Sequence, residues 1–391
     1  MKKATLLLAL CLTTLRLAAQ DGNANPFVLG ADISWYSQME DEGYRFAVDT
    51  QTTSCPKMLK AYGLTAARLR VWVGPQNAYN GKEDVVTKAK AASAEGLDVM
   101  IDFHFSDTWA DPGSQTVPSA WAEDDLEALK AHLSAHVTEV LEALLAEGVS
   151  PRWVQIGNET NDGLLWEQGR ASAHPQQYAA LLEAGYQAVK ATSPETQVIV
   201  HLSNGHDQGL FDWNLGLLTQ NNAHFDLIGM SLYPGNDSQT EGIVSNAMQN
   251  IRHLRSAFGK QVMIVEVGLP VGAGSTGKAL MKSILEQAAH QTDGACTGVL
   301  YWEPEAFPGW NHYQMGAASV NNKVVRFNAT MDAFRETADL LSIVGVPAPS
   351  PATPSAIYDL QGRLAPAASP GPHVVKLSNG HVVKTLHRQA Q

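Results

Sequence analysis

Short apolar runs alternate with longer amphipathic stretches along most of the chain, from about residue 27 to residue 344. The short runs are rich in Val, Ile and Leu, and the stretches between them repeat apolar residues every three or four positions. This alternation is typical of strand–helix units that build a parallel sheet. The apolar runs predict eight strands, at 28–34, 66–72, 97–103, 152–158, 196–202, 226–232, 261–267 and 297–303.

Eight consecutive strand–helix units predict the α/β class and a closed (β/α)8 TIM barrel. The clearest helix is LEALKAHLSAHVTEVLEALLAEG at 126–148, which ends in a glycine suited to a helix C-terminus. A doubly wound open sheet is the alternative, but it usually has a Gly-rich phosphate loop after its first strand, and GADISW lacks one. We therefore expect one catalytic barrel domain over residues 21–345.

The first 20 residues have the pattern of an export signal. A basic MKK precedes the apolar run ATLLLALCLTTL, and RLAAQ then resembles a cleavage zone. The run is too short for a stable transmembrane helix, and no later stretch reaches the roughly 18 apolar residues that one needs. We expect an exported protein that is periplasmic, on the cell surface or secreted, and not transmembrane. Cys11 leaves lipid anchoring open.

The C-terminal end has a third pattern. Residues 346–355 form a Pro-rich linker, and 356–391 contain the alternating segments AIYDLQGRL and HVVKLSNGHVVKTL, which predict a small β module with a hairpin at SNG. The IYDLQGR pattern resembles, in a degenerate form, the C-terminal sorting domains of type IX secretion. A short β appendage without any role in export is the alternative.

Composition narrows the range of partners. The formal net charge is -12 and Lys and Arg form no cluster, which argues against nucleic acid and suits a neutral substrate. After removal of the signal, Cys55 and Cys296 are too few for a zinc cluster or a disulfide framework; they either pair with each other or stay as free buried thiols. We expect a monomer without cofactors.

Two glutamates stand at the ends of predicted strands, where barrel enzymes build their active sites. Glu159 follows the fourth strand in VQIGNE, and Glu266 interrupts the otherwise apolar seventh strand VMIVEV. A buried lone carboxylate costs several kcal/mol unless it is paired or used in catalysis. We expect the fourth and seventh strands on opposite sides of the barrel, with the two carboxylates facing each other across its mouth. At roughly 5 to 5.5 Å, such a pair hydrolyses glycosidic bonds with retention.

The neighbours suggest a role for each carboxylate. Arg70, at the end of the second strand, and Tyr233, just after the sixth, are expected to donate hydrogen bonds to Glu266 and keep it ionised as the nucleophile. Glu159 has no obvious cation beside it and is expected to be the acid/base. The alternatives are that Arg70 only pairs with a neighbouring acid and that Glu159 only stabilises the first turn of the next helix.

Other polar and aromatic residues are expected around the same rim. Asn158 would hold the sugar hydroxyl next to the reacting carbon, and Trp302 would form a stacking floor under the sugar. Asp102 points either to the rim or into the barrel. Glu303 and Glu305 rank lower as catalysts because the eighth strand is not expected to face the fourth. The remaining candidates for contact with substrate are Asp32, Trp35, Trp72, His104, Asp107, Trp109, Asp111 and Trp166.

With these residues assembled, the barrel resembles glycoside hydrolase family 53, the endo-β-1,4-galactanases of a large retaining clan. The similarity runs through GADISW, LRVW, DFHFSDTWADPGSQTVPSAW, VQIGNE, GLLW, SLYP, VEV and YWEP, and covers about residues 27–342. The resemblance implies cleavage inside galactan or type I arabinogalactan side chains of pectin with retention, Glu159 as acid/base and Glu266 as nucleophile. Cellulases, mannanases and xylanases of the clan share the two glutamates and stay as alternatives.

The sequence also bears on metal binding and on two other classes of protein. Some bacterial members of the family bind calcium in a long loop after the seventh strand, but GLPVGAGSTGKAL is short and lacks the oxygen ligands, so no metal is expected. A metal-dependent hydrolase using Asp102, His104, Asp107 and His201 is disfavoured because the first strand has no His-x-His pair. A non-catalytic glycan-binding barrel is disfavoured because both glutamates are present.

Overall fold

The computed structural model describes residues 27–235, 238–344, 354–358, 371–377 and 382–387. Eight parallel strands form a closed barrel in the order β1-β10-β9-β8-β7-β6-β5-β4, which β1 and β4 close by pairing with each other. The predicted (β/α)8 barrel is therefore confirmed. Its strands are β1 (Val28–Asp32), β4 (Ala66–Val71), β5 (Asp98–Phe103), β6 (Trp153–Ile156), β7 (Gln197–Leu202), β8 (Leu227–Leu232), β9 (Gln261–Val267) and β10 (Cys296–Trp302).

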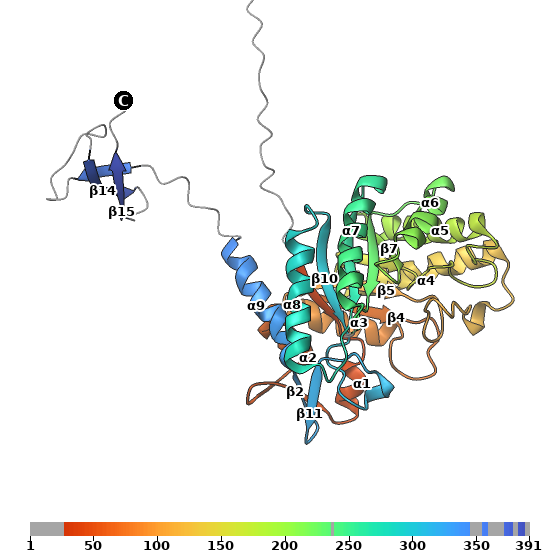
Figure 1. Cartoon of the computed structure of the whole chain (residues 1–391). Helices are drawn as coiled ribbons and strands as arrows, with labels where there is room; N and C mark the ends of the chain where they lie inside the picture. Colours follow the sequence, from red (N-terminus) through yellow and green to blue (C-terminus); the bar gives the residue numbers. More distant parts are fainter. Residues whose placement is uncertain (1–26, 236–237, 345–353, 359–370, 378–381, 388–391) are drawn as a thin grey trace, which may run out of the picture.

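Helices lie around the outside of the barrel (Figure 1). The long predicted helix is α4; the Asp125 side chain caps it by accepting a hydrogen bond from the Ala128 N–H, and Gly148 follows it with φ +77°. The helices are α1 (Tyr36–Asp41), α2 (Cys55–Ala61), α3 (Lys82–Ala94), α4 (Leu126–Ala146), α5 (Pro175–Thr192), α6 (Gln208–Gln220), α7 (Thr240–Phe258), α8 (Gly274–His290) and α9 (Ala329–Val344), with 3-10 turns η1 (Ser119–Trp121) and η2 (Trp310–His312).

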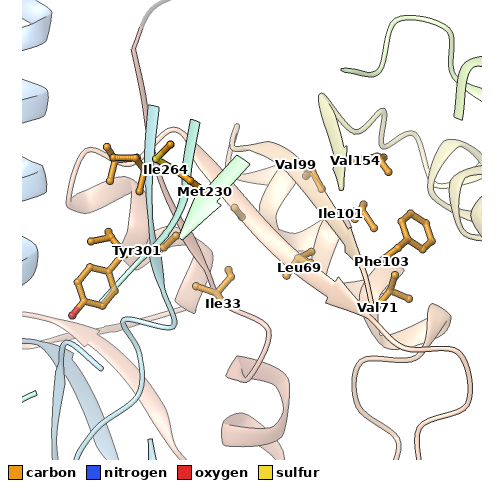
Figure 2. Close-up of a cluster of buried hydrophobic side chains, with 14 of the residues drawn as sticks. Ile33, Leu69, Val71, Val99, Ile101, Phe103, Val154, Met230, Ile264 and Tyr301 are labelled. Atoms are coloured by element: carbon orange, nitrogen blue, oxygen red, sulfur yellow. The ribbon is translucent and has the colours of Figure 1, made fainter. Parts of the chain in front are cut away.

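Alternate residues of each barrel strand belong to different layers of the core. One set packs outward with the helices, and Figure 2 shows several of its side chains, including Leu69, Ile101 and Val154. The other set fills the lower part of the barrel interior with apolar side chains. That lower layer consists of Val28, Ala66, Met100, Trp153, Ile199, Leu227, Met263, Val265 and Leu300.

The upper part of the barrel interior is polar. On most strands the polar residue lies two positions beyond an apolar interior residue, as Arg68 follows Ala66 and His201 follows Ile199, so the same face of the strand changes character towards its C-terminal end. We call this set the polar ring; it consists of Asp32, Arg68, Asp102, Gln155, His201, Ser231 and Glu266, each at most 5% exposed.

Strand β9 reaches the polar ring through an irregularity. Met230 of β8 pairs with Ile264, but the next residue, Ser231, pairs with Glu266, so Val265 is the extra residue of a bulge. Val265 packs with the lower interior, and Glu266 contacts the polar ring although it directly follows Val265. Without the bulge, strict alternation would turn Glu266 away from the barrel interior.

A second sheet was not predicted. Its order is β11-β12-β2-β3, and it joins the loop after β1 to the loop after β10. Only β12 and β2 pair in parallel. The hairpin of β2 and β3 comes from near the start of the barrel sequence, and the hairpin of β11 and β12 comes from near its end. Its strands are β2 (Arg45–Val48), β3 (Gln51–Thr53), β11 (Ala318–Asn321) and β12 (Val324–Phe327).

The predicted C-terminal β module is present as a third sheet. Strands β13 (Pro354–Tyr358), β14 (Gly371–Leu377) and β15 (Val382–His387) pair antiparallel in that order. β13 begins at Pro354, two residues before the expected start of the module at residue 356. Most of the linker, the hairpin turn at SNG and the expected export signal lie outside the described residues.

Two further sequence questions have structural answers. Cys55 and Cys296 are both buried and unpaired, so the free-thiol alternative is the correct one. Among the described residues, no helix combines the length and the apolar character needed to cross a bilayer.

Candidate active site

Arg68 is the centre of the polar ring. Its guanidinium donates to Asp32 Oδ2 at 2.9 Å, to Asp102 Oδ2 at 2.9 Å and to Gln155 Oε1 at 2.7 Å. The same group lies 2.8 Å from Glu266 Oε1. Because its carboxylate neighbours compensate for burial, the pKa of Arg68 lies above its usual value and the side chain stays charged.

Glu266 receives donors from two sides. Besides Arg68 at Oε1, the Tyr233 hydroxyl donates to Oε2 at 2.9 Å, as the sequence predicted for the tyrosine. Gly268 leaves room for that tyrosine, since a Cβ there would lie 2.8 Å from the Tyr233 ring and 3.0 Å from the Tyr313 hydroxyl. Tyr233 thus reaches Glu266 because the residue two positions after the carboxylate has no side chain.

The prediction that Arg70 contacts Glu266 is wrong. Arg70 instead forms an ion pair with Glu303, and its guanidinium lies over the Trp109 ring at 4.3 Å. Arg70 and Arg68 lie on the same face of β4, but Arg70 is two residues nearer the strand end, above the polar ring. The alternative reading of Arg70 as the partner of a neighbouring acid is the correct one.

Glu159 stands just beyond β6 in a turn. Gly157 and Glu159 both have positive φ, +87° and +47°, which bends the chain sharply after the strand. The Glu159 N–H donates to His201 Nδ1 at 3.3 Å, and its Oε1 accepts from the Ser231 hydroxyl at 2.6 Å. Glu159 keeps part of its surface exposed, whereas Glu266 is only 5% exposed.

The two carboxylates are close enough to interact. Ser231 Oγ, which donates to Glu159, also lies 3.5 Å from Glu266 Oε2. Burial raises the pKa of Glu266, while Arg68 lowers it and the charge of Glu159 raises it. Burial likewise raises the pKa of Glu159, against the lowering effect of the Ser231 hydroxyl. Two buried carboxylates in this position share a proton more readily than they both ionise.

The expectation that the fourth and seventh strands face each other is also wrong. In the ring order, β7 and β8 separate β6 from β9 on one side. The strand directly opposite β6 is β10, so the expectation that the eighth strand does not face the fourth is wrong as well. The glutamates approach because β6 ends in a turn towards the ring and the β9 bulge turns Glu266 inward. Glu303, after β10, is fully buried between Arg70 and the Trp35 N–H, and Glu305 is fully buried as well.

Asn158 and His104 each contact a member of the polar ring and have most of their polar atoms occupied. Asn158 accepts from Arg68 at Oδ1 and donates to the Ala110 carbonyl at 2.8 Å. His104 accepts from the Trp72 indole and the Ala110 N–H at Nδ1, so its Nε2 carries the proton and donates to Asp102 at 3.0 Å. Asp102 therefore points into the barrel and not to the rim.

Two predicted sugar contacts have other partners. Asp32 is fully buried in the polar ring, where it accepts from Arg68 and from the Ser34 N–H and hydroxyl. Asp107 accepts from the Gly74 N–H at 2.9 Å and from the Ser119 N–H and hydroxyl at 2.8 and 2.6 Å. Both carboxylates therefore organise the protein itself: Asp32 orients Arg68, and Asp107 ties two rim loops together.

Aromatic side chains line a hollow beside the carboxylates, on the side of β1 and β10. Trp302, the last residue of β10, packs edge-on against Tyr313 at 4.7 Å and against Trp35 at 5.5 Å between ring centroids. The hollow has a volume of about 520 Å³, large enough for sugar rings. Its lining consists of Trp35, Gln38, Trp72, Asn77, Asn80, Trp109, Trp302, Asn311, His312 and Tyr313. Trp166 is not part of it and lies instead under Arg170, whose guanidinium is 3.7 Å from the ring centroid.

Sequence reasoning missed three members of the polar ring: Arg68, Gln155 and Ser231. Each lies on the same strand face as an apolar interior residue, and a polar residue in such a run is the signal that could have found it. That reasoning was applied to Glu266 but not to these strands. In the described part of the chain, no group of three or more His, Cys, Asp or Glu side chains is arranged to hold a metal ion.

Comparisons with the sequences of known proteins identify one family of glycoside hydrolases. The profile of "Glycosyl hydrolase family 53" matches residues 28–335. A protein of Aspergillus terreus named "Probable arabinogalactan endo-beta-1,4-galactanase A" is 32% identical over 326 residues, which cover 76% of this chain and 90% of that protein. The "Endo-beta-1,4-galactanase" of Bacillus subtilis is 30% identical over 318 residues, covering 74% of this chain and 72% of its own length.

Solved structures give the same picture. A fungal β-1,4-galactanase structure superposes with a TM-score of 0.71 at 26% identity, covering 80% of this chain and 99% of the other. The GH53 catalytic domain from Ignisphaera aggregans superposes with a TM-score of 0.70, covering 79% of this chain and 96% of the other. At 23% identity, this second likeness concerns the fold alone.

Proposed function

Because this chain belongs to glycosyl hydrolase family 53 and is thus a glycoside hydrolase, we propose that it is an endo-β-1,4-galactanase. Its substrates would be the internal β-1,4-galactosidic bonds of galactan and type I arabinogalactan. The names of the Aspergillus terreus and Bacillus subtilis relatives support this substrate class. The observation that carries the proposal is the contact of one serine hydroxyl with both Glu159 and Glu266.

That contact supports a retaining mechanism. Inverting enzymes hold their two carboxyl groups roughly 6.5 to 9.5 Å apart, leaving room for a water molecule, whereas retaining enzymes hold them roughly 5 to 5.5 Å apart. Ser231 Oγ lies 2.6 Å from an oxygen of Glu159 and 3.5 Å from one of Glu266. Those two oxygens are therefore too close together for the inverting arrangement.

The contacts also support one order of roles. Burial raises the pKa of both glutamates, but the guanidinium and the phenol that donate to Glu266 favour its ionised form, so we assign the single negative charge of the pair at neutral pH to Glu266, the nucleophile. Glu159 then holds the proton and gives it to the glycosidic oxygen while Glu266 bonds to the anomeric carbon. In the second step Glu159 takes a proton from water, and the water oxygen displaces Glu266 from the sugar.

The remaining predicted substrate contacts form part of the same proposal. Trp302 and Trp109 line the hollow and would pack against sugar rings, and Asn158 and His104, which bind Arg68 and Asp102 of the polar ring, would contact the sugar at the cleavage point. We further propose export, on the N-terminal signal pattern, action as a monomer without cofactors, and a sorting role for the C-terminal sheet.

Hydrolysis of linear β-1,4-galactan tests the proposal, with cellulose, mannan and xylan in parallel. The wild type is expected to release short galacto-oligosaccharides and to leave the other three polymers intact. Glu159→Ala and Glu266→Ala are each expected to fold and to lose several orders of magnitude in kcat. Azide is expected to rescue Glu266→Ala alone and to give a product of inverted configuration. Cleavage of another polymer at a higher rate would replace the substrate; no cleavage of any would leave a glycan-binding barrel.

A further inference from the structure

Ser231 lies between the two carboxylates and is not one of the residues that the reaction uses directly. Its hydroxyl oxygen is 2.6 Å from Glu159 Oε1, 3.5 Å from Glu266 Oε2 and 2.9 Å from His201 Nε2. Ser231 is 1% exposed and His201 is fully buried, so neither hydroxyl nor imidazole has solvent as an alternative partner. A hydroxyl has one proton to donate, and the direction of that donation is set by its neighbours.

His201 fixes the direction. Its Nδ1 lies 3.0 Å from Gln155 Nε2 and 3.3 Å from the Glu159 backbone N–H, and both of these groups are donors. The Gln155 amide cannot be turned round, because its oxygen accepts from Arg68 and its nitrogen donates to Asp102. Asn158 Oδ1 is an acceptor 3.0 Å from Nδ1, but it already accepts from Arg68. The two donors therefore favour an Nδ1 without a proton.

His201 is therefore neutral, with its proton on Nε2. Burial lowers the pKa of His201 well below its usual value, and the Arg68 charge lowers it further. The Nε2–H donates to Ser231 Oγ, so Ser231 must donate its own proton onward. The nearer acceptor is Glu159 Oε1 at 2.6 Å; the 3.5 Å contact with Glu266 is too long to compete.

A carboxyl oxygen that accepts this short hydrogen bond is a poor place for the acid proton. In the described part of the chain, Glu159 Oε2 accepts no hydrogen bond, and Glu159 remains partly exposed. We propose that His201 and Ser231 act as positioning residues that keep Oε1 of Glu159 unprotonated and so place the catalytic proton on Oε2, the oxygen free to meet the glycosidic oxygen. This inference rests on the proposed acid/base role of Glu159.

The same hydrogen bond also affects the pH at which Glu159 titrates. Donation by Ser231 stabilises the ionised carboxylate and opposes the effect of burial, so its loss should raise the pKa of Glu159. The other groups that act on Glu159 come from separate elements and stay in place when Ser231 is changed. They are Arg68 on β4, Asp102 on β5, Asp111 in the loop after β5, His201 on β7, Tyr233 after β8 and Glu266 on β9.

Two substrates and one titration test the proposal with Ser231→Ala. The substrates are β-1,4-galactan, whose leaving group needs a proton, and 2,4-dinitrophenyl β-galactobioside, whose leaving group departs without one. We expect kcat/KM to fall about 10- to 100-fold on galactan and to change little on the dinitrophenyl substrate. We also expect the alkaline limb of the galactan profile, and the midpoint of Glu159 in ¹³C NMR of labelled glutamate, to move up by about one pH unit.

Control variants separate positioning from folding. Ser203→Ala removes another buried rim hydroxyl, one that accepts from Asn161 and contacts neither carboxylate, and should leave both rates and the Glu159 midpoint unchanged. Ser231→Thr keeps the hydroxyl and should restore most of the galactan rate. If Ser231→Ala fails to fold, Ser231→Cys, with a similar volume and a weaker donor, is expected to show the same changes at smaller size.

Each outcome decides something. Equal losses on the two substrates would mean that Ser231 serves Glu266 or the fold, and unchanged rates with an unchanged midpoint would mean that it does not act on Glu159; either result overturns the inference. If the wild type cleaves neither substrate, the proposed function fails, but the NMR midpoint of Glu159 still tests the link from Ser231.

Discussion

The lower and upper parts of the barrel interior are built on the same strands and are equally closed to solvent, yet they are chemically opposite. Ala66, Met100 and Leu300 fill the lower part with apolar side chains. Arg68 and Asp102, only two residues further along two of these strands, belong to the polar ring. The comparison shows that a barrel separates packing from chemistry along the length of each strand, since every second residue returns to the same interior face.

The polar ring is tolerated at full burial because its members satisfy one another. Arg68 alone has five partners within 2.9 Å: Asp32, Asp102, Gln155, Asn158 and Glu266. A fully connected network of this kind is stable at low local dielectric, whereas the loss of one member leaves the others buried without partners. The lower layer has no such dependence, because an apolar side chain makes many weak contacts and no obligatory one.

The largest losses are expected when the upper layer is made to resemble the lower one. Arg68→Met fills similar space but leaves Asp32, Asp102 and Glu266 without their cation. We expect a loss of about 3–5 kcal/mol or more in the free energy of unfolding and of roughly 10³-fold or more in kcat/KM. Urea denaturation and galactan hydrolysis measure the two effects.

Arg152→Met is the matched control for that variant. Arg152 pairs with Asp98 at 2.6 Å at the start of the strands, and both side chains are partly exposed, so its loss should cost less than about 1 kcal/mol. An Arg68→Met protein as stable and as active as Arg152→Met would show that the polar ring does not depend on its cation.

The barrel could be predicted from the sequence because each of its eight strands is a short, almost uninterrupted apolar run. Runs such as QVMIVEV and TQVIVHL match the observed strands to within a residue or two. The sheet of β2, β3, β11 and β12 could not be predicted in this way. Its strands are only three or four residues long, two of them carry mostly exposed side chains, and its central pairing joins residues at opposite ends of the barrel sequence.

The site was predictable in its residue types more than in its pairings. A lone Glu266 in an apolar run pointed to the active site, but the choice between Arg68 and Arg70 depends on depth in the barrel, and LRLR gives no information about depth. The bulge at Val265 is equally hidden, because VMIVEV has no glycine or proline to mark it. Ring order, register and bulges are tertiary properties, and they decide which of two similar side chains meets the carboxylate.

A cavity in the lower layer tests the same separation of packing from chemistry in the apolar part of the barrel. Leu300 is fully buried and lies close to Gly30 of the neighbouring strand, where an added Cβ would approach it to 2.8 Å. Leu300→Ala is expected to cost about 2–5 kcal/mol in the free energy of unfolding. Below the melting transition, kcat/KM and its pH profile should stay within about twofold, because Leu300 packs in the lower apolar layer and its truncation removes no hydrogen bond of the polar ring.

Thermal and urea unfolding of Leu300→Ala, beside activity at 25 °C, measure this separation. Val320→Ala serves as the control, since Val320 is 37% exposed on β11 and its truncation should change stability by no more than about 0.5 kcal/mol. A Leu300→Ala enzyme with an altered pH profile would mean that the two layers are mechanically coupled and that packing and chemistry are not separated along the strands.

The smallest expected effect concerns the stability of the polar ring in acid. Burial alone would raise the pKa of Asp102, but Arg68 and His104 lower it to about 2, from a usual value of 3.8. A carboxyl group with a depressed pKa in the folded state contributes stability that is complete above its unfolded pKa and is lost as the pH falls through its folded pKa. The contribution of Asp102, about 2 kcal/mol, should therefore disappear between about pH 4 and pH 2.

Asp102→Asn removes this titration while keeping the shape of the side chain. The variant should be less stable than the wild type at pH 7, because Arg68 loses one of its carboxylates, and the gap between the two proteins should narrow as the pH falls from 4 towards 2. Asp98→Asn, on the partly exposed pair with Arg152, is the control and should cost less than about 1 kcal/mol at pH 7. Urea midpoints at half-unit steps of pH measure the gap. A gap that stays constant down to pH 2 would mean that Asp102 does not titrate in this window and that its charge is not what binds Arg68 into the ring.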